Sequence, residues 1–351
     1  MAGWLERVCR ASSLKPYSPP PGGGCIRLDL NESPFPPPLP AVEEAYSYLV
    51  RGNRYPRREL MEGLLGLLSE YTGAPREWIV VGGGGDSILS ALFSLLHGLR
   101  IAVPRYSFSM YARLAAVYGA SVTELPVRPE RDTWVVEGLV DAAAGADAVF
   151  IDRPNNPTGS LLADRGVFEE AASRGSALIV VDEAYYEFSG ETLAELVEYG
   201  NVVVVRTMSK AFGMAGMRLG YAIAPPRVAE ALRNILYPFP ASAPSLAMAS
   251  ALLRSRRLVE ERVARIREWR ERLASALRLL GARVYRSWSN FLLVDLTDLI
   301  PGDAAAELRA RGVCVKPTPL GRGVVRVSVG RWEEDEELLE AVREASRRPR
   351  A

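Results

Sequence analysis

The chain has 351 residues, which is enough for two domains, because single hydrophobic cores stop growing at about 250–300 residues. Its net charge of +1 argues against a nucleic-acid surface, and no apolar run reaches the roughly 18 residues of a membrane span. The first ten residues carry charges where a signal peptide needs an apolar core, so we expect a cytoplasmic chain that binds neither membrane nor nucleic acid.

Residues 1–40 are rich in proline and glycine, and we expect an extended arm that ends in a short strand at residues 26–30 and joins a small domain. Helical patterns then alternate with short apolar runs as far as about residue 224. This alternation predicts a mainly parallel sheet covered by helices on both faces, in a large domain over residues 41–245. The strand runs, in chain order, are WIVVG, RIAVP, AVFID, ALIVVD, NVVVVRT and GYAIA.

The texture changes after NILYPFPASAPS. A long helix is expected over residues 247–280, followed by two strands, a helix over residues 304–311 and the strand GVVRVSVG. We predict a smaller α/β domain over residues 246–351.

Cysteine and histidine offer little chemistry. Cys9, Cys25 and Cys314 are odd in number and far apart, so we expect neither a disulfide nor a metal site. The single histidine, His97, ends a helical pattern and is interpreted as a capping residue. Proton transfer is therefore expected to use lysine, tyrosine or a carboxylate.

Lysine is rare in this chain. Of 43 basic residues only Lys15, Lys210 and Lys316 are lysines. Lys15 and Lys316 each precede a proline, and chance explains them. Lys210 follows a buried strand, and because a guanidinium does not deprotonate to become a nucleophile, we expect its amine to act chemically.

Polar residues follow four strand runs, where open α/β sheets bind ligands. Gly82–Gly85 precede an apolar helix and suit an anion, although a simple turn explains them equally well. Asn155–Gly159 also read as a turn. Asp182 closes the third run beside Tyr185, where a buried carboxylate needs a cation or hydrogen bonds. The fourth end carries Thr207, Ser209, Lys210 and Arg218.

These four ends together suit pyridoxal phosphate, which has a phosphate, a basic ring nitrogen and an aldehyde. The segments NNPTG, VDEAYYEF and TMSKAFGMAGMRLG resemble those of fold-type I pyridoxal-phosphate enzymes. LKPYSPPPG, LDLNESPFPP, NRYPRREL, PRYSFSMY, YPFPASAP and VVRVSVG make the histidinol-phosphate aminotransferase family the most similar one. The resemblance spans nearly the whole chain and implies a seven-stranded sheet in the large domain.

The resemblance also implies a role for each matching residue. Lys210 would carry the cofactor and move the substrate proton, and Asp182 would keep the pyridine nitrogen protonated. A homodimer is implied as well, because Tyr55 would reach the phosphate of the other subunit. The remaining cofactor contacts would be Asn156 and Tyr185 at the ring hydroxyl, Tyr106 on the ring face, and Gly85, Asp86, Thr207, Ser209 and Arg218 at the phosphate.

The substrate side departs from the family pattern. Arg326 matches the arginine that clamps a substrate carboxylate, and Tyr17 and Asn31 match residues near the entrance. Lys316 stands where the family has a phosphate-binding arginine, so either Lys316 still binds that phosphate or the distal group of the substrate differs. Ser87 and Arg57 also depart from the pattern.

The leading functional hypothesis is an aminotransferase that makes histidinol phosphate and 2-oxoglutarate from imidazole-acetol phosphate and glutamate. An aromatic or aspartate aminotransferase, and a lyase similar to threonine-phosphate decarboxylase, are the alternatives. A binding protein without turnover would be expected to lack Lys210 or Asp182, and the chain has both.

Overall fold

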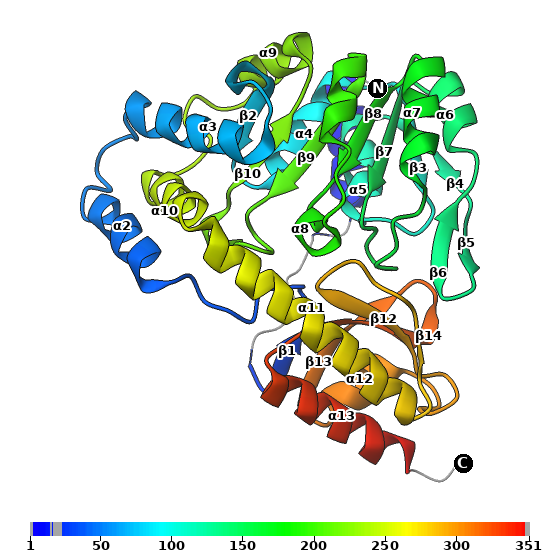
Figure 1. Ribbon diagram of the computed structural model, residues 1–351. Coiled ribbons are helices and arrows are strands. Elements are labelled where there is room, and N and C mark those ends of the chain that lie inside the picture. The colour runs from blue at the N-terminus through cyan, green and yellow to red at the C-terminus, as the bar shows by residue number, and fades with distance from the viewer. Residues whose placement is uncertain (1–2, 15, 17–22, 348–351) are drawn as a thin grey trace.

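The computed structural model describes residues 3–14, 16 and 23–347 and is built around two sheets (Figure 1). A seven-stranded sheet fills the upper part of the view, a five-stranded sheet lies below it, and helix α11 (Arg256–Leu279) runs diagonally from one part to the other. None of the helices in the described part of the chain is both long and apolar enough to cross a membrane.

The larger sheet has the strand order β2-β10-β9-β8-β7-β3-β4 and is parallel except at β10, which is antiparallel to both of its neighbours. This confirms the mainly parallel, seven-stranded prediction. Its strands are β2 (Ile79–Gly82), β3 (Arg100–Pro104), β4 (Ser121–Leu125), β7 (Ala148–Asp152), β8 (Leu178–Asp182), β9 (Val202–Thr207) and β10 (Gly220–Ile223).

Apolar side chains cover both faces of this sheet, which explains why its strands are near-continuous apolar runs. In β7, Val149 and Ile151 belong to one buried cluster and Phe150 to the cluster on the opposite face. The surrounding helices are α3 (Arg58–Thr72), α4 (Gly85–Leu95), α5 (Met110–Tyr118), α6 (Leu139–Gly145), α7 (Arg165–Arg174), α8 (Tyr186–Ser189) and α9 (Pro226–Ile235), with short 3₁₀ turns at Arg76–Trp78, Ala194–Tyr199 and Ala215–Met217.

The smaller sheet has the order β1-β13-β14-β12-β11, and only the β1–β13 pair is parallel. Its apolar face packs on α11 and on α12 (Ala304–Arg309) and α13 (Trp332–Ser346). A separate hairpin joins β5 (Val127–Glu130) and β6 (Thr133–Val136). The strands of the smaller sheet are β1 (Ile26–Leu28), β11 (Arg283–Val284), β12 (Phe291–Asp295), β13 (Val313–Thr318) and β14 (Gly321–Ser328).

Two expectations about helices were wrong. Residues 3–13 are not extended but form α1 (Gly3–Ser13), which packs on α5, because the proline and glycine residues of the arm lie after this segment. The single helix expected over residues 247–280 is two helices, α10 (Ala243–Arg254) and α11, with Ser255 between them. The Ser255 N–H bonds the carbonyls of Ala251 and Leu252 and so ends α10. Helix α2 (Leu39–Leu49) precedes α3 and packs on α10.

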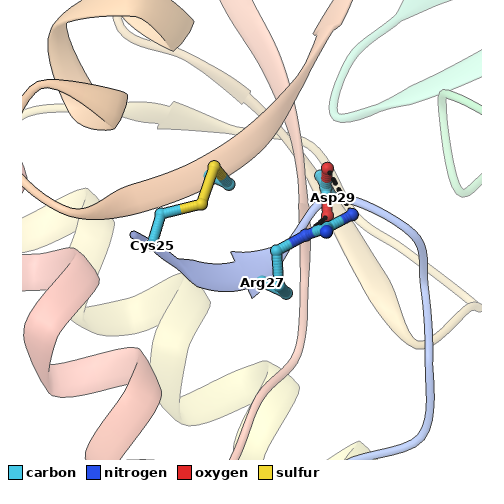
Figure 2. The surroundings of a disulfide bond; sticks show 4 residues. Cys25, Arg27 and Asp29 are labelled. Atoms are coloured by element: carbon cyan, nitrogen blue, oxygen red, sulfur yellow. Dashed lines mark hydrogen bonds and ion pairs between the residues drawn. A yellow bond between two sulfur atoms is a disulfide. The ribbon is translucent and has the colours of Figure 1, made fainter. Parts of the chain in front are cut away.

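The expectation of no disulfide was also wrong. Cys25 and Cys314 form a disulfide with a Cα–Cα distance of 5.7 Å, although 289 positions separate them in the chain (Figure 2). The parallel pairing of β1 with β13 places them side by side, since Ile26 pairs with Val313. Cys9 is free and exposed. His97 lies in the exposed turn just after α4.

Candidate active site

A cavity of about 530 Å³ opens at the carboxyl ends of β7, β8 and β9, and residues from β1, β13 and β14 or just beyond them close it from the other side. The carboxyl ends of parallel strands lie at the same edge of a sheet, because the chain returns through a helix between one strand and the next. Among the residues expected at the site, the cavity is lined by Asn31, Gly85, Asp86, Tyr106, Asn156, Asp182, Tyr185, Thr207, Ser209, Lys210, Arg218, Lys316 and Arg326.

One end of the cavity suits a phosphate. It is formed by the first turn of α4, whose free N–H groups and dipole favour an anion. Gly84 has φ 89°, and a Cβ there would come within 2.8 Å of the Arg218 guanidinium, so glycine is needed for the close approach. The Arg218 Nη2 lies 2.9 Å from Asp86 Oδ2, and the Thr207 hydroxyl donates to Ser209 Oγ at 2.9 Å.

Lys210 follows β9 and points into the middle of the cavity. Its Nζ donates to the main-chain oxygen of Leu30 at 2.9 Å. Burial, together with the positive charge of Arg326, lowers the pKa of Lys210 to about 8. With this pKa roughly a tenth of the amine is neutral at pH 7, far more than for an ordinary lysine, and the neutral form is the one a nucleophile requires.

Asp182 ends β8 and lies on the cavity wall. Its carboxylate accepts hydrogen bonds from the Tyr111 hydroxyl at 3.1 Å and from the Ala184 N–H at 3.0 Å, and no side-chain cation in the described residues forms an ion pair with it. Burial raises its pKa to about 6. Such a carboxylate is stabilised by a cationic ring nitrogen. Nothing in the sequence marked Tyr111 as a site residue, because an aromatic residue with a fully buried ring is typical of the core.

Asp152 is a second buried carboxylate that sequence reasoning missed. It ends β7 opposite Asp182, and burial raises its pKa to about 7. Its two oxygens accept hydrogen bonds from Asn155 Nδ2 at 2.8 Å and from the Asn156 N–H at 2.7 Å. Asn155 Nδ2 also donates to the Tyr106 carbonyl at 2.8 Å. Asp152 is therefore the centre of the turn that presents Asn156 and Tyr106.

The other end of the cavity is cationic. Arg326 donates to Asn156 Oδ1 and to the Asp29 carbonyl, both at 2.5 Å, and Lys316 is its direct cross-strand neighbour. Burial and the charge of Arg326 lower the pKa of Lys316. Asn31 Nδ2 donates to the Tyr185 hydroxyl at 2.9 Å.

Two expected residues are not in this cavity. Tyr55 is 77% exposed and its ring stacks on Phe239 with centroids 4.3 Å apart, so it does not reach the pocket of its own chain. Tyr17 lies outside the described residues.

The arrangement fits pyridoxal phosphate on its own chemistry. An anion cradle without side chains at Gly84 and Gly85, a carboxylate that lacks a cation and an amine of lowered pKa occupy one cavity. These groups match the phosphate, the ring nitrogen and the aldehyde of this cofactor. The second cationic end is left for the substrate.

Comparison with known proteins agrees with this chemistry. The family model "Aminotransferase class I and II" matches residues 24–342. The histidinol-phosphate aminotransferase of Thermococcus gammatolerans is 39% identical over 337 residues, which is 95% of each chain. A histidinol-phosphate aminotransferase from Sinorhizobium meliloti, solved with pyridoxal-5'-phosphate, matches 92% of this chain and 91% of its own with a TM-score of 0.82 and 26% identity. An L-threonine-O-3-phosphate decarboxylase from Porphyromonas gingivalis shares the fold over 91% of this chain and 98% of its own, with a TM-score of 0.79 and 19% identity.

Proposed function

This chain belongs to the class I and II aminotransferases and uses pyridoxal phosphate, and from that premise we propose that it is a histidinol-phosphate aminotransferase of histidine biosynthesis. The observation that carries the choice of substrate is the pair of cations at the far end of the cavity, where Lys316 and Arg326 are cross-strand neighbours. Two cations suit a reaction in which one partner carries a phosphate and the other a carboxylate.

We propose that the bound cofactor supplies an aldehyde for the amino group and a ring that accepts electrons. Asp182, which forms no ion pair within the described part of the chain, would place its negative charge at the ring nitrogen and so stabilise the proton there. Asn156 and Tyr185 would hydrogen-bond the ring hydroxyl, and Tyr106 would pack on the ring face. Gly85, Asp86, Thr207, Ser209 and Arg218, which line the same cavity, would hold the phosphate.

Lys210 is the proposed base for the substrate proton. Because its pKa is lowered, the neutral amine is available to take the proton from the α-carbon of the substrate and to return it later. The Leu30 carbonyl accepts one hydrogen bond from Nζ and so helps to keep the amine in the cavity.

Arg326 is the proposed carboxylate clamp for glutamate. Its fork is oriented by the Asn156 side chain and the Asp29 carbonyl. Lys316 is the proposed partner of the phosphate, with Asn31 nearby and Tyr17 at the entrance. Replacing Lys316 with Met should raise the KM for histidinol phosphate about tenfold and leave that for glutamate within about twofold. Equal changes for both would contradict the assignment.

The substrate is tested by half-reactions. Histidinol phosphate, glutamate, aspartate, phenylalanine and threonine phosphate are mixed separately with the holoenzyme, and each true amino donor converts the aldehyde-form spectrum to that of the amine form. Conversion by aspartate or phenylalanine but not by histidinol phosphate would overturn the proposal. Release of carbon dioxide from threonine phosphate would instead select the lyase.

We also propose a homodimer. The exposed side of α2 carries several large apolar side chains beside Glu43 and Ser47, whereas Ala41 and Ala45 on its other face are buried. An apolar face of this kind marks an association surface. Its members are Leu39, Val42, Tyr46, Leu49 and, just after the helix, Val50.

The proposed role of Tyr55 in the partner's pocket has a direct test. A mixed dimer of Lys210→Ala and Tyr55→Ala chains should contain one complete site of two and recover roughly half of the wild-type activity. No recovery in a verified mixed dimer would show that Tyr55 does not act across the interface.

Two further parts of the proposal concern organisation. We divide the chain into an arm over residues 1–40, a large domain over residues 41–245 and a small domain over residues 246–351. β1 of the arm joins the smaller sheet, whereas α1 of the arm packs on α5 of the large domain. A cytoplasmic location is proposed from the reaction. The disulfide is compatible with it if the source is a hyperthermophile, whose intracellular proteins retain disulfides.

A further inference from the structure

The Cys25–Cys314 disulfide lies at the edge of the smaller sheet, where it ties the start of β1 to β13 (Figure 2). β1 has three residues and pairs with β13 alone. An edge strand this short contributes few ladder hydrogen bonds, so its first residues depend on other restraints. The disulfide is a covalent restraint at that point.

The chain that leaves β1 enters the cavity at once. Asp29, Leu30 and Asn31 are consecutive, and each contacts a different group of the proposed site. The contacts are the Asp29 carbonyl with Arg326 Nη2 at 2.5 Å, the Leu30 carbonyl with Lys210 Nζ at 2.9 Å, and Asn31 Nδ2 with the Tyr185 hydroxyl at 2.9 Å.

This segment is anchored at two points. At the far point the Asn31 N–H donates to Ser328 Oγ at 2.8 Å, and Asn290 Nδ2 donates to the Asn31 carbonyl at 3.0 Å. The Arg27–Asp29 ion pair visible in Figure 2 is internal to the segment and does not tie it to the sheet. The near point consists of the short β1 ladder, the buried side chain of Leu28 in the apolar cluster of the smaller sheet, and the disulfide.

We propose that the Cys25–Cys314 disulfide is a positioning element of the active site, which sets the Asp29 and Leu30 carbonyls against Arg326 and Lys210. This inference rests on the roles given to Arg326 and Lys210 in the proposed function. Each carbonyl accepts one N–H of its partner and so holds that side chain in place at the cavity wall. A loosened β1 would let both carbonyls move while the Asn31 anchor remained in place.

The test compares the double variant Cys25→Ser/Cys314→Ser with Cys9→Ser, a matched control at the free, exposed cysteine. Constants are measured well below the unfolding midpoint of each protein. In the double variant the KM for glutamate should rise about tenfold, the loss of roughly one oriented hydrogen bond, and kcat should fall several-fold because Lys210 is the proposed base. The Cys9→Ser enzyme should match the wild type.

Cofactor affinity is the second readout and needs no substrate. Titration of the apoproteins with pyridoxal phosphate should give a dissociation constant several-fold higher for the double variant than for Cys9→Ser, because Lys210 loses its orientation. If the wild type failed to transaminate any donor, the proposed function would fall while this comparison still tested the disulfide. Unchanged KM and unchanged cofactor affinity in a folded double variant would overturn the inference.

Reduction of the wild type covers the case of a variant that does not fold. Cys314 is buried and Cys25 is partly exposed, so a reductant reaches the bond from the side of Cys25. Tris(carboxyethyl)phosphine, with one water, gives two thiols and the phosphine oxide, and it is removed under nitrogen before assay. The reduced enzyme should show the same rise in KM, and reoxidation should reverse it. A reduced enzyme with wild-type constants would contradict the proposal.

Discussion

Replacing Asp152 with asparagine removes one of two acceptors beneath Asn156 and Tyr106. The carboxylate accepts from Asn155 Nδ2 at 2.8 Å and from the Asn156 N–H at 2.7 Å. Asparagine keeps one side-chain oxygen and has an NH₂ group in place of the other. That NH₂ group would lie against the Asn155 Nδ2 or the Asn156 N–H, which is itself a donor, so one hydrogen bond is lost. The turn that carries Asn156, and through it the Arg326 fork, is expected to shift.

The size of the effect follows from the lost bond. A hydrogen bond to a charged acceptor contributes about 1.5–3 kcal/mol, which corresponds to roughly ten- to a hundredfold in kcat/KM. This applies at pH 8 and above, where Asp152, with a pKa raised to about 7 by burial, is mostly ionised. At pH 6 it is mostly protonated, and asparagine resembles that form. The ratio of wild-type to variant kcat/KM should therefore shrink as the pH falls.

The assay is a steady-state pH series with glutamate as amino donor. Asp164→Asn is the matched control, because Asp164 is exposed and its side chain does not cap α7. A wild-type-to-variant ratio near one at pH 8, or a ratio that does not change with pH, would refute the reasoning. Asp182 lies beside Asp152 and titrates near pH 6 in the cofactor-free protein, so the series is run on the holoenzyme.

Three other predictions follow from single contacts. Lys210→Ala should abolish borohydride fixation of the cofactor without unfolding the chain, and label found by mass spectrometry at another lysine would refute the assignment. Arg326→Lys loses the forked geometry and should raise the KM for glutamate about a hundredfold with a smaller change in kcat; an unchanged KM would exclude a carboxylate clamp. Burial of the Glu187 carboxyl raises its pKa from 4.5 to about 8. Its contribution to the free energy of unfolding is therefore complete below the pKa of the unfolded chain and is lost as the pH rises through 8. Glu187→Gln should therefore gain in denaturant stability relative to the wild type between pH 6 and 9, and a constant difference would contradict this.

The positions of the proposed catalytic groups were predictable because they follow local rules. Lys210 and Asp182 come directly after apolar runs that are buried on both faces, and polar residues at such points lie at the ligand edge of a parallel sheet. The same rule reached Asn156 and Ser209. It did not identify Asp152, which was interpreted only as the last residue of its strand. The hydrogen bonds that Asp152 accepts from Asn155 and Asn156 form only once the turn is folded.

Helix boundaries were less predictable. Residues 3–13 were assigned to an extended arm from the composition of residues 1–40 as a whole, although the prolines and glycines lie mostly beyond Ser13. The break at Ser255 was missed because no glycine or proline marks it. The helical patterns on its two sides follow each other directly.

The sequence by itself determined the alternation of strands and helices and the places of Lys210 and Asp182 at the ends of buried strands, because these depend on short-range pattern and on side-chain chemistry. Only the tertiary structure decided the Cys25–Cys314 disulfide, the contact of Tyr111 with Asp182 and the arrangement of Lys316 beside Arg326. Each of these joins residues that are remote in the chain or set side by side by strand register. Register and packing arise from the whole fold, and no local pattern encodes them.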